Sequence, residues 1–204
     1  MESERYSLSF TSASLLHRES LIVAELFLQL KDWKQVRAKV IDQNLLQVRT
    51  LNTSKRFFRE VASRLRTLSS AELELLVNGT LHEQRYLLWL AICRRYRFIG
   101  DFAAEVLREN FISLKTFLSY EDFDAFFNRK AEWREELEQI KPATQVKLRR
   151  TLFQMMREAD LLTPENLISP ALLSPDLLQA IPKEHYQDLF FFPAFESDLK
   201  QWAY

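Results

Sequence analysis

The sequence predicts an all-α fold, a compact protein of about seven or eight helices. Apolar residues make up 47% of the 204 residues, which is enough to build a substantial core. The chain has only 2 glycines and 6 prolines, too few turn residues for a typical β fold. Apolar side chains also recur at helical spacing along most of the chain.

The helices of the first half follow from this periodicity and from residues that begin helices. Asn52 and Thr53 are good N-caps and are expected to start a helix. Ser69 and Glu72 have the spacing of a capping box, which predicts a short helix immediately after it. The helices expected in this half span 12–30, 33–44, 53–68 and 69–77.

The second half contains the segment that is expected to form the centre of the fold. Residues 82–99 are apolar on nearly every side, which is typical of a buried helix. Ser119 and Asp122 have the spacing of a second capping box, and Pro142 separates the next helix from the last one. The other helices expected here span 102–110, 122–133 and 143–159.

The composition of the chain changes after Asp160. Residues 161–182 contain four prolines, and the stretch between Pro170 and Pro175 is too short for a helix. A helix that ends in EADLL before a short extended pair predicts a β-hairpin near residues 161–173, similar to the end of a winged helix. We therefore expect a helical domain over 1–160. Residues 161–204 form an acidic, aromatic segment that is expected to pack on the same domain, because large exposed apolar patches are uncommon.

Charge is distributed unevenly although the net charge is zero, with 28 basic and 28 acidic residues. Residues 158–204 contain two basic and eight acidic residues, whereas residues 1–157 contain 26 basic and 20 acidic ones. This asymmetry predicts a basic surface with an acidic appendage.

The helix over 53–68 is predicted to have two opposed sides. On a helical wheel one side is apolar, and the other side is basic. Lys55 and Arg56 fall in its expected first turn, where free backbone amides attract anions and where acidic residues are usual. Phosphate binding is therefore favoured over a merely solvated surface, although the latter is the commoner role of charged helix faces.

The candidate nucleic-acid-binding residues come from this wheel and from two further basic clusters. The primary candidates are Arg49, Ser54, Lys55, Arg56, Arg59 and Arg66. Lys147, Arg149 and Arg150, on the helix after Pro142, are second-line contacts. Arg94 and Arg95 could instead form ion pairs with acids such as Asp101 or Glu105.

Residues 32–66 can be drawn as a helix, a connection and the basic helix. The expected connection, 45–52, is longer than the three or four residues of a standard helix-turn-helix motif. The basic helix could instead lie along the DNA phosphates, which would give binding with strong salt dependence and little sequence preference.

The residues needed for several kinds of enzyme chemistry are missing. The three histidines lie on separate elements without metal-ligand spacing, and two glycines cannot build a phosphate-binding loop. No serine occupies a nucleophile elbow. We therefore expect a protein that is not an enzyme and that uses no metal or cofactor.

The cellular location of the protein can also be predicted. Cys93 is the only cysteine and lies in an apolar stretch, so it is expected in the core of a protein from a reducing compartment. The longest apolar run, 87–93, is far shorter than the roughly 20 residues that cross a bilayer. The N-terminal residues do not resemble a signal peptide. A cytoplasmic protein without a membrane partner is expected.

Five stretches of sequence resemble the BrxA family of BREX phage-defence systems. They are YSLSFTSASLLHRESLIVAELFLQLKDW, LLQVRTLNTSKRFFREVASRLRTLSSAELELLVNG, EQRYLLWLAICRRYRFIGDFAAEVLRE, DFDAFFNRKAEW and LISPALLSPDLL. The similarity extends from Tyr6 to Pro193 and rests on long stretches, not on a catalytic signature.

The resemblance implies a compact helical accessory protein that binds double-stranded DNA and has no established catalytic activity. It also implies action beside other BREX subunits, which include a methyltransferase, a large ATPase and a phosphatase-like protein. RNA remains open as a ligand. The competing interpretation is a protein–protein adaptor, in which the basic face and the C-terminal segment bind BREX subunits and not DNA.

Overall fold

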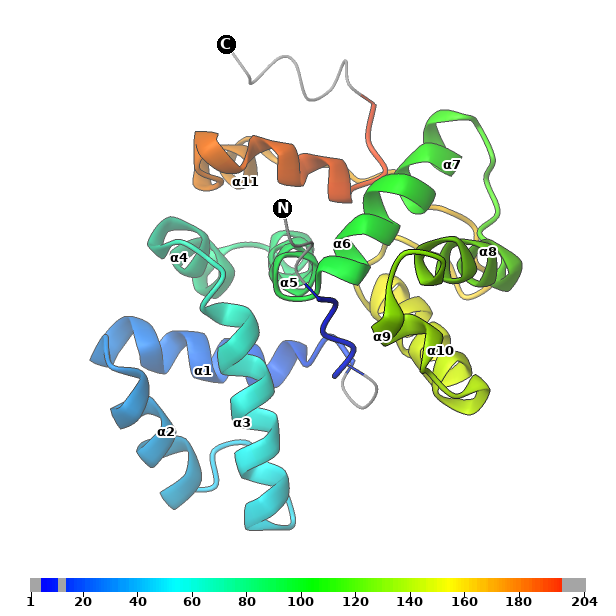
Figure 1. Ribbon diagram of the computed structural model, residues 1–204. Helices are drawn as coiled ribbons and strands as arrows, with labels where there is room; N and C mark the ends of the chain where they lie inside the picture. Colours follow the sequence, from blue (N-terminus) through cyan, green and yellow to red (C-terminus); the bar gives the residue numbers. More distant parts are fainter. Residues whose placement is uncertain (1–4, 11–13, 196–204) are drawn as a thin grey trace.

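The computed structural model describes residues 5–10 and 14–195. In these ranges the chain is helical and forms no β-sheet, so the predicted all-α fold is confirmed (Figure 1). The α-helices are α1 His17–Leu30, α2 Trp33–Asp42, α3 Leu51–Leu65, α4 Ser70–Asn78, α5 Leu81–Arg95, α6 Arg97–Phe102, α7 Glu109–Ile112, α8 Tyr120–Ala131, α9 Glu135–Glu138, α10 Pro142–Glu158 and α11 Pro175–Ala180. A π-helix, Ala103–Arg108, joins α6 to α7, and a 3-10 helix, Lys183–Phe191, follows α11.

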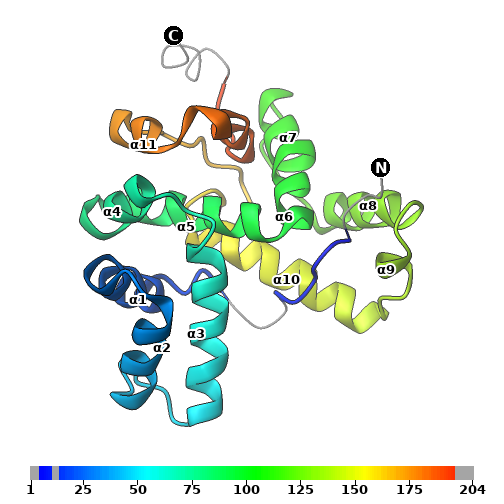
Figure 2. The ribbon, with the colours of Figure 1, turned by 60° about the vertical axis from the view of Figure 1, so that its left-hand side comes forward.

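Helix α5 forms the centre of the molecule, as its apolar sequence predicted. Every residue from Tyr86 to Cys93 is buried, and Trp89 is completely inaccessible to solvent. Helices α1, α3 and α4 pack on one part of α5, and α10 crosses another part (Figures 1 and 2). The helix expected over 82–99 is interrupted at Tyr96, whose backbone leaves the helical region with φ −119° and ψ 89°.

Helices α1, α2 and α3 form an arm at one end of the molecule (Figures 1 and 2). Helix α1 contacts both other helices, and its buried residues include Val23 and Ala24. The end of α2 and the start of α3 project from the body. The connection between them, residues 43–50, lies at the tip of the arm.

The N-terminal residues 5–10 cross the body between α3 and the region of α8 and α9 (Figure 2). The backbone N–H of Tyr6 donates to Glu136 Oε1 at 2.9 Å, and its ring lies 4.2 Å from the guanidinium of Arg134. Phe10 is fully buried and packs edge-on against Tyr96, with the ring centroids 5.4 Å apart. This segment therefore ties the arm side of the molecule to the α9 side.

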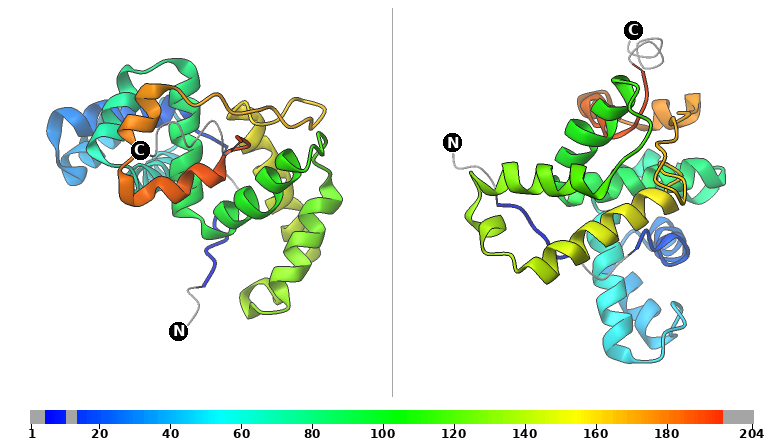
Figure 3. Two further views of the ribbon diagram at one scale, coloured as in Figure 1. Left: turned by 90° about the horizontal axis from the view of Figure 1, so that it is seen from above. Right: turned by 90° about the vertical axis from the view of Figure 1, so that its right-hand side faces the viewer.

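The C-terminal aromatic residues pack back on the helical body as far as the structure describes them (Figure 3). Phe192 is completely buried against Tyr86, and the indole N–H of Trp89 donates to the carbonyl of Phe191 at 2.9 Å. Phe195 contacts Phe111, with the ring centroids 4.7 Å apart. The rest of the predicted acidic segment, 196–204, lies outside the described residues.

The predicted capping boxes are confirmed, while several helix boundaries differ. Ser69 with Glu72 and Ser119 with Asp122 cap α4 and α8. Helix α1 begins at His17 and not at residue 12, because Leu16 has a left-handed backbone with φ 55°. The short helices α9 and α11 were not predicted, and α11 begins with a proline at a first-turn position that needs no N–H donor.

The expected β-hairpin near residues 161–173 does not form strands. The chain turns back over 161–169, but only isolated bridges connect Leu162 to Ile168 and Leu167 to Phe117. The backbone of Asn166 takes a positive φ of 66° in the tight turn between the first pair. Pro164 and Pro170 lack N–H donors on either side of the turn, which limits the ladder to a few hydrogen bonds.

Candidate nucleic-acid interface

Helix α3 buries one side and exposes the other. Phe58, Val61 and Leu65 are buried, each no more than 4% exposed, and they attach α3 to the arm. Thr50 is the N-cap, because its side chain accepts a hydrogen bond from the Thr53 amide at 3.2 Å. The helix therefore begins at Leu51, two residues earlier than the sequence predicted.

The exposed side of α3 carries a row of polar side chains. Asn52, Arg56, Arg59 and Ser63 are spaced four, three and four residues apart, so they lie along one line of the helix surface. We call these four residues the α3 crest. Lys55 and Arg66 flank the crest on the side that faces α2, and both are exposed.

The positive charge of this surface is not neutralised within the structure. Among the described residues, no carboxylate forms an ion pair with Lys55, Arg56, Arg59 or Arg66. Between residues 31 and 66 the chain has ten basic and three acidic residues. A concentration of like charge without partners costs stability, which makes a functional surface the better explanation.

The single acid of α3, Glu60, lines a pocket beside the crest, and two neighbouring side chains hold its carboxylate there. Glu60 accepts hydrogen bonds from Arg64 Nε at 2.8 Å and from the Tyr96 hydroxyl at 2.6 Å. Burial and the hydrogen bond to this carboxylate raise the pKa of Tyr96 to about 12. Glu60 is therefore engaged internally, and it ties α3 to the end of α5 instead of pairing with the crest arginines.

The crest lies between two concave surfaces. The first, about 640 Å³ in volume, separates α3 from α2 and is lined by Arg37, Lys55 and Arg66 together with the crest. Arg66 also lies over the ring of Trp33 at 5.0 Å, which holds its guanidinium at the edge of this groove.

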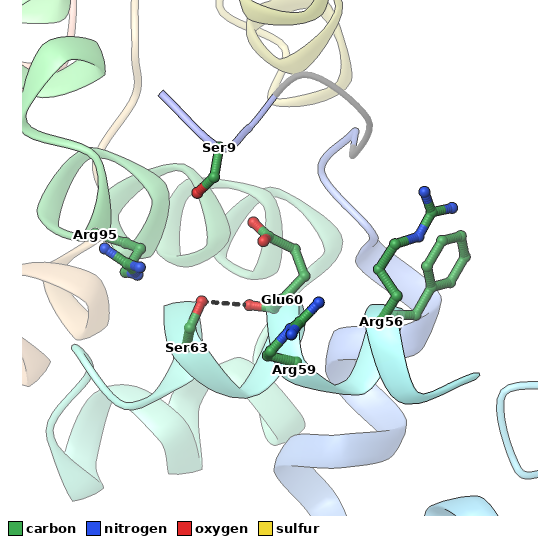
Figure 4. A pocket seen from close by; sticks show the side chains of 7 residues that line it. Ser9, Arg56, Arg59, Glu60, Ser63 and Arg95 are labelled. Atoms are coloured by element: carbon green, nitrogen blue, oxygen red, sulfur yellow. Dashed lines mark hydrogen bonds between the residues drawn. The ribbon is translucent and has the colours of Figure 1, made fainter. Parts of the chain in front are cut away.

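The second concave surface, about 300 Å³, lies on the opposite side of the crest. Figure 4 shows Ser9 and Arg95 across this pocket from the crest residues. Arg56, Arg59 and Ser63 line both hollows, so these three crest residues form their common wall. The Ser63 hydroxyl donates to the Glu60 carbonyl at 2.8 Å.

Four of the primary candidates, Lys55, Arg56, Arg59 and Arg66, come together on this surface. Arg49 is exposed and directly precedes the N-cap of α3, at the tip of the arm. Because the helix begins at Leu51, Lys55 and Arg56 belong to the second turn and not to the first. The argument from first-turn amides therefore does not apply to them, while their exposure on the charged side remains.

The structure does not support Ser54 as an anion contact. Its side chain is 2% exposed, and its backbone N–H donates to the Thr50 carbonyl at 3.0 Å, inside the helix. The sequence contained the signal, because Ser54 is spaced four, seven and eleven residues from the buried residues Phe58, Val61 and Leu65. Ser54 therefore lies on the apolar side of α3.

The second-line candidates lie on α10 and not beside α3. Arg149 forms an ion pair with Asp124 and lies 4.7 Å from the ring of Tyr120, so it joins α10 to α8. Lys147 and Arg150 are exposed, but the N-terminal half of α10 lies next to α9, away from α3 (Figures 1 and 3). The structure does not bring these three residues to the α3 surface.

Two arginines beside the crest were missed as candidates. Arg37 projects from α2 and Arg95 from the end of α5, so only tertiary packing brings them to α3. Ion pairs of Arg94 and Arg95 with acids such as Asp101 or Glu105 were the other possibility, and Arg94 does pair with acids, but not with these two. Those two acids instead contact Tyr6 and Lys130.

Arg94 and Arg95 have different environments although they are neighbours. Arg94 is largely buried and contacts Glu72 at 2.8 Å and Asp188 at 2.6 Å. Arg95 lies over the ring of Tyr96 at 5.1 Å and has no carboxylate partner in the described part of the chain. Of the two, only Arg95 is available to the second hollow.

Two general properties complete the description of the surface. Within residues 5–10 and 14–195, no three histidine, cysteine or acidic side chains gather in a way that could hold a metal ion. None of the helices in these ranges is both long enough and apolar enough to cross a membrane.

Comparison with known proteins identifies related sequences and a similar fold among solved structures. Residues 4–185 match the BrxA family model. The BREX protein BrxA of Escherichia coli O9:H4 (strain HS) is 27% identical over 177 residues, which cover 86% of this chain and 83% of the relative. The BREX protein BrxA of Bacillus cereus (strain H3081.97) is 27% identical over 125 residues, 61% of this chain and 62% of the relative.

The fold is also similar to that of an uncharacterized protein from Magnetospirillum magneticum, known from its crystal structure. The TM-score is 0.76 at 19% sequence identity, and the match covers 93% of this chain and 98% of the other. At this level of identity, the likeness concerns the fold alone.

Proposed function

Since this chain belongs to the BrxA family of BREX phage-defence systems, we propose that it is a non-catalytic DNA-binding accessory protein of such a system. It acts in the cytoplasm and holds duplex DNA mainly through phosphate contacts from α3. The observation that carries the proposal is the row of cations on α3 that have no carboxylate partner among the described residues.

The physical argument concerns counterions. Each phosphate that a lysine or arginine neutralises releases condensed cations, so the logarithm of affinity falls with the logarithm of salt concentration by about 0.9 per contact. Contacts from Arg49, Lys55, Arg56, Arg59 and Arg66 would give a slope of roughly −4 to −5. Arginines already engaged by carboxylates would contribute little, because binding them to phosphate requires breaking an existing ion pair.

A fluorescence-anisotropy titration with a short duplex across a salt series tests the proposal. Arg56→Glu combined with Arg59→Glu is expected to abolish measurable binding while circular dichroism and the melting temperature stay close to those of the wild type. The matched control is Lys147→Glu with Arg150→Glu, which makes the same charge change on exposed positions of α10. Equal losses in the two double variants would refute α3 as the binding surface.

The alternative is a protein–protein adaptor that binds other BREX subunits. Phe190 and Phe195 favour it, because they are 43% and 41% exposed on the C-terminal segment. A cut at Pro182 would remove the buried residues Leu189 and Phe192, so the informative variant is Phe190→Ser with Phe195→Ser in the full chain. Loss of BREX subunits from a pull-down, with DNA affinity retained, would assign these two residues to assembly.

RNA and catalysis are tested in the same preparation. A duplex RNA of the same sequence is titrated at the same salt concentrations, and tighter binding of the RNA than of the DNA would refute DNA as the ligand. Prolonged incubation is expected to leave the DNA uncleaved, in agreement with a protein that binds without catalysis.

A further inference from the structure

An arginine from another helix stands on each flank of the crest. Lys55, Arg66 and Arg37 stand on the side of α2. Arg95 stands on the other side with the Ser9 hydroxyl and with the Glu60 carboxylate, which Arg64 and Tyr96 already engage. A helix that only followed one DNA strand would need cations along a single flank. Cations on both flanks fit a ligand that presents phosphates on both sides of the helix at once.

The major groove of duplex DNA presents phosphates in this way. It is about 12 Å wide, and an α-helix with its side chains is about 10–12 Å across. The arm projects its α2–α3 end from the body, so the start of α3 lies away from α5 to α10 (Figures 1 and 2). The eight-residue connection at the tip does not alter which side of α3 is exposed.

We propose, building on the DNA-binding function above, that the α3 crest enters the major groove and that its side chains contact base edges. Arg37 and Arg95 hold phosphates on the two opposite strands. Asn52 lies in the first turn, and Arg56 and Arg59 lie in the next turns, so the N-terminal half of α3 meets the bases.

The crest side chains have the chemistry for this role. An arginine guanidinium can donate to O6 and N7 of guanine together, and an asparagine amide can pair with N6 and N7 of adenine. Arg56 and Arg59 have no carboxylate partner within the described ranges, so their donors remain available. Affinity still comes mainly from phosphates, and the base contacts add a sequence preference.

A duplex in which every guanine is replaced by 7-deazaguanine tests this inference. The replacement removes the N7 acceptor in the major groove and leaves the phosphates unchanged. The wild type is expected to bind the modified duplex at least fivefold more weakly than the unmodified duplex of the same sequence.

Two variants separate base contacts from phosphate contacts. Arg56→Gln with Arg59→Gln is expected to bind both duplexes equally, because the groups that read N7 are gone. Arg37→Gln with Arg95→Gln removes the same number of charges from the flanks. It is expected to weaken binding to both duplexes while the ratio between them stays at the wild-type value.

The outcomes are distinguishable from those of the proposed function. Salt-dependent binding of the wild type with equal affinity for both duplexes would overturn the major-groove inference and leave DNA binding intact. No binding to either duplex at low salt would overturn the proposed function itself. A ratio that disappears in the flank variant and persists in the crest variant would also refute the assignment of roles.

Discussion

The buried ion-pair network around Arg94 predicts a large loss of stability when this arginine is replaced. Arg94 contacts Glu72 on α4 and Asp188 on the 3-10 helix, and it also donates to the carbonyl of Thr67 at 3.0 Å. The side chains of Glu72 and Asp188 are 0% and 9% exposed. Arg94→Met keeps much of the volume and removes the arginine that links these carboxylates.

The size of the effect follows from the charges left behind. Removing one partner of a buried ion pair costs about 3–5 kcal/mol, because the other charge stays buried without compensation. Here two carboxylates lose their partner. Glu72 keeps a hydrogen bond of 2.6 Å from the Ser69 amide, and His185 lies 3.8 Å from Asp188, which limits the loss. We expect a decrease of about 4 kcal/mol, a large part of a typical stability of 5–15 kcal/mol.

Urea denaturation followed by circular dichroism measures this loss. The expected result is a lower midpoint with an unchanged slope, because the native contact surface is retained.

The neighbouring arginine is the control for this experiment. Arg95→Met is expected to change stability by less than about 1 kcal/mol, because Arg95 has no carboxylate partner in the described chain. A loss below about 1 kcal/mol in Arg94→Met, or equal losses in both variants, would refute the reasoning.

Phe192→Ala is expected to cost about 3–5 kcal/mol, because the ring is completely buried; urea denaturation checks this, and a loss below about 1 kcal/mol would contradict it. Hydrogen bonds from Ser174 and from the Thr80 amide lower the pKa of Glu83 below its usual 4.5. The ionised Glu83 carboxylate therefore stabilises the fold fully above pH 4.5, and this stabilisation is lost as the pH falls through the lowered pKa. Glu83→Gln is expected to make the free energy of unfolding depend less on pH in this range. A profile unchanged from that of the wild type would contradict the prediction. Arg149→Gln is expected to leave the salt slope of DNA binding unchanged, whereas a slope shallower by about one would place this residue on the DNA.

Local patterns in the sequence were sufficient to predict most of the helical elements. The capping boxes at Ser69 and Ser119 depend on residues three positions apart, so they could be recognised without the fold. The central position of α5 followed from apolar residues on all its sides. The break at Tyr96 was missed, because it accompanies a contact with Glu60, 36 residues away in the chain.

The placement of the candidate residues could be predicted where it depends on one helix, and it was missed where it depends on packing. The exposure of Arg56 and Arg59 follows from the periodicity of α3 alone. Arg37 and Arg95 come from other helices, and no local pattern shows that they reach the same surface. The ion pair of Arg149 with Asp124 could not be foreseen, because Asp124 lies 25 residues away in the sequence.

The burial of Cys93 has a practical consequence for observing the proposed surface. Its side chain is 2% exposed, and burial raises the pKa of its thiol well above the usual value, so it reacts poorly with alkylating reagents. Because Cys93 is the only cysteine, Ser9→Cys would carry the single readily labelled thiol of the protein. A fluorophore at this exposed position would sit at the mouth of the hollow beside Arg95, where it would report directly on whatever occupies that side of α3.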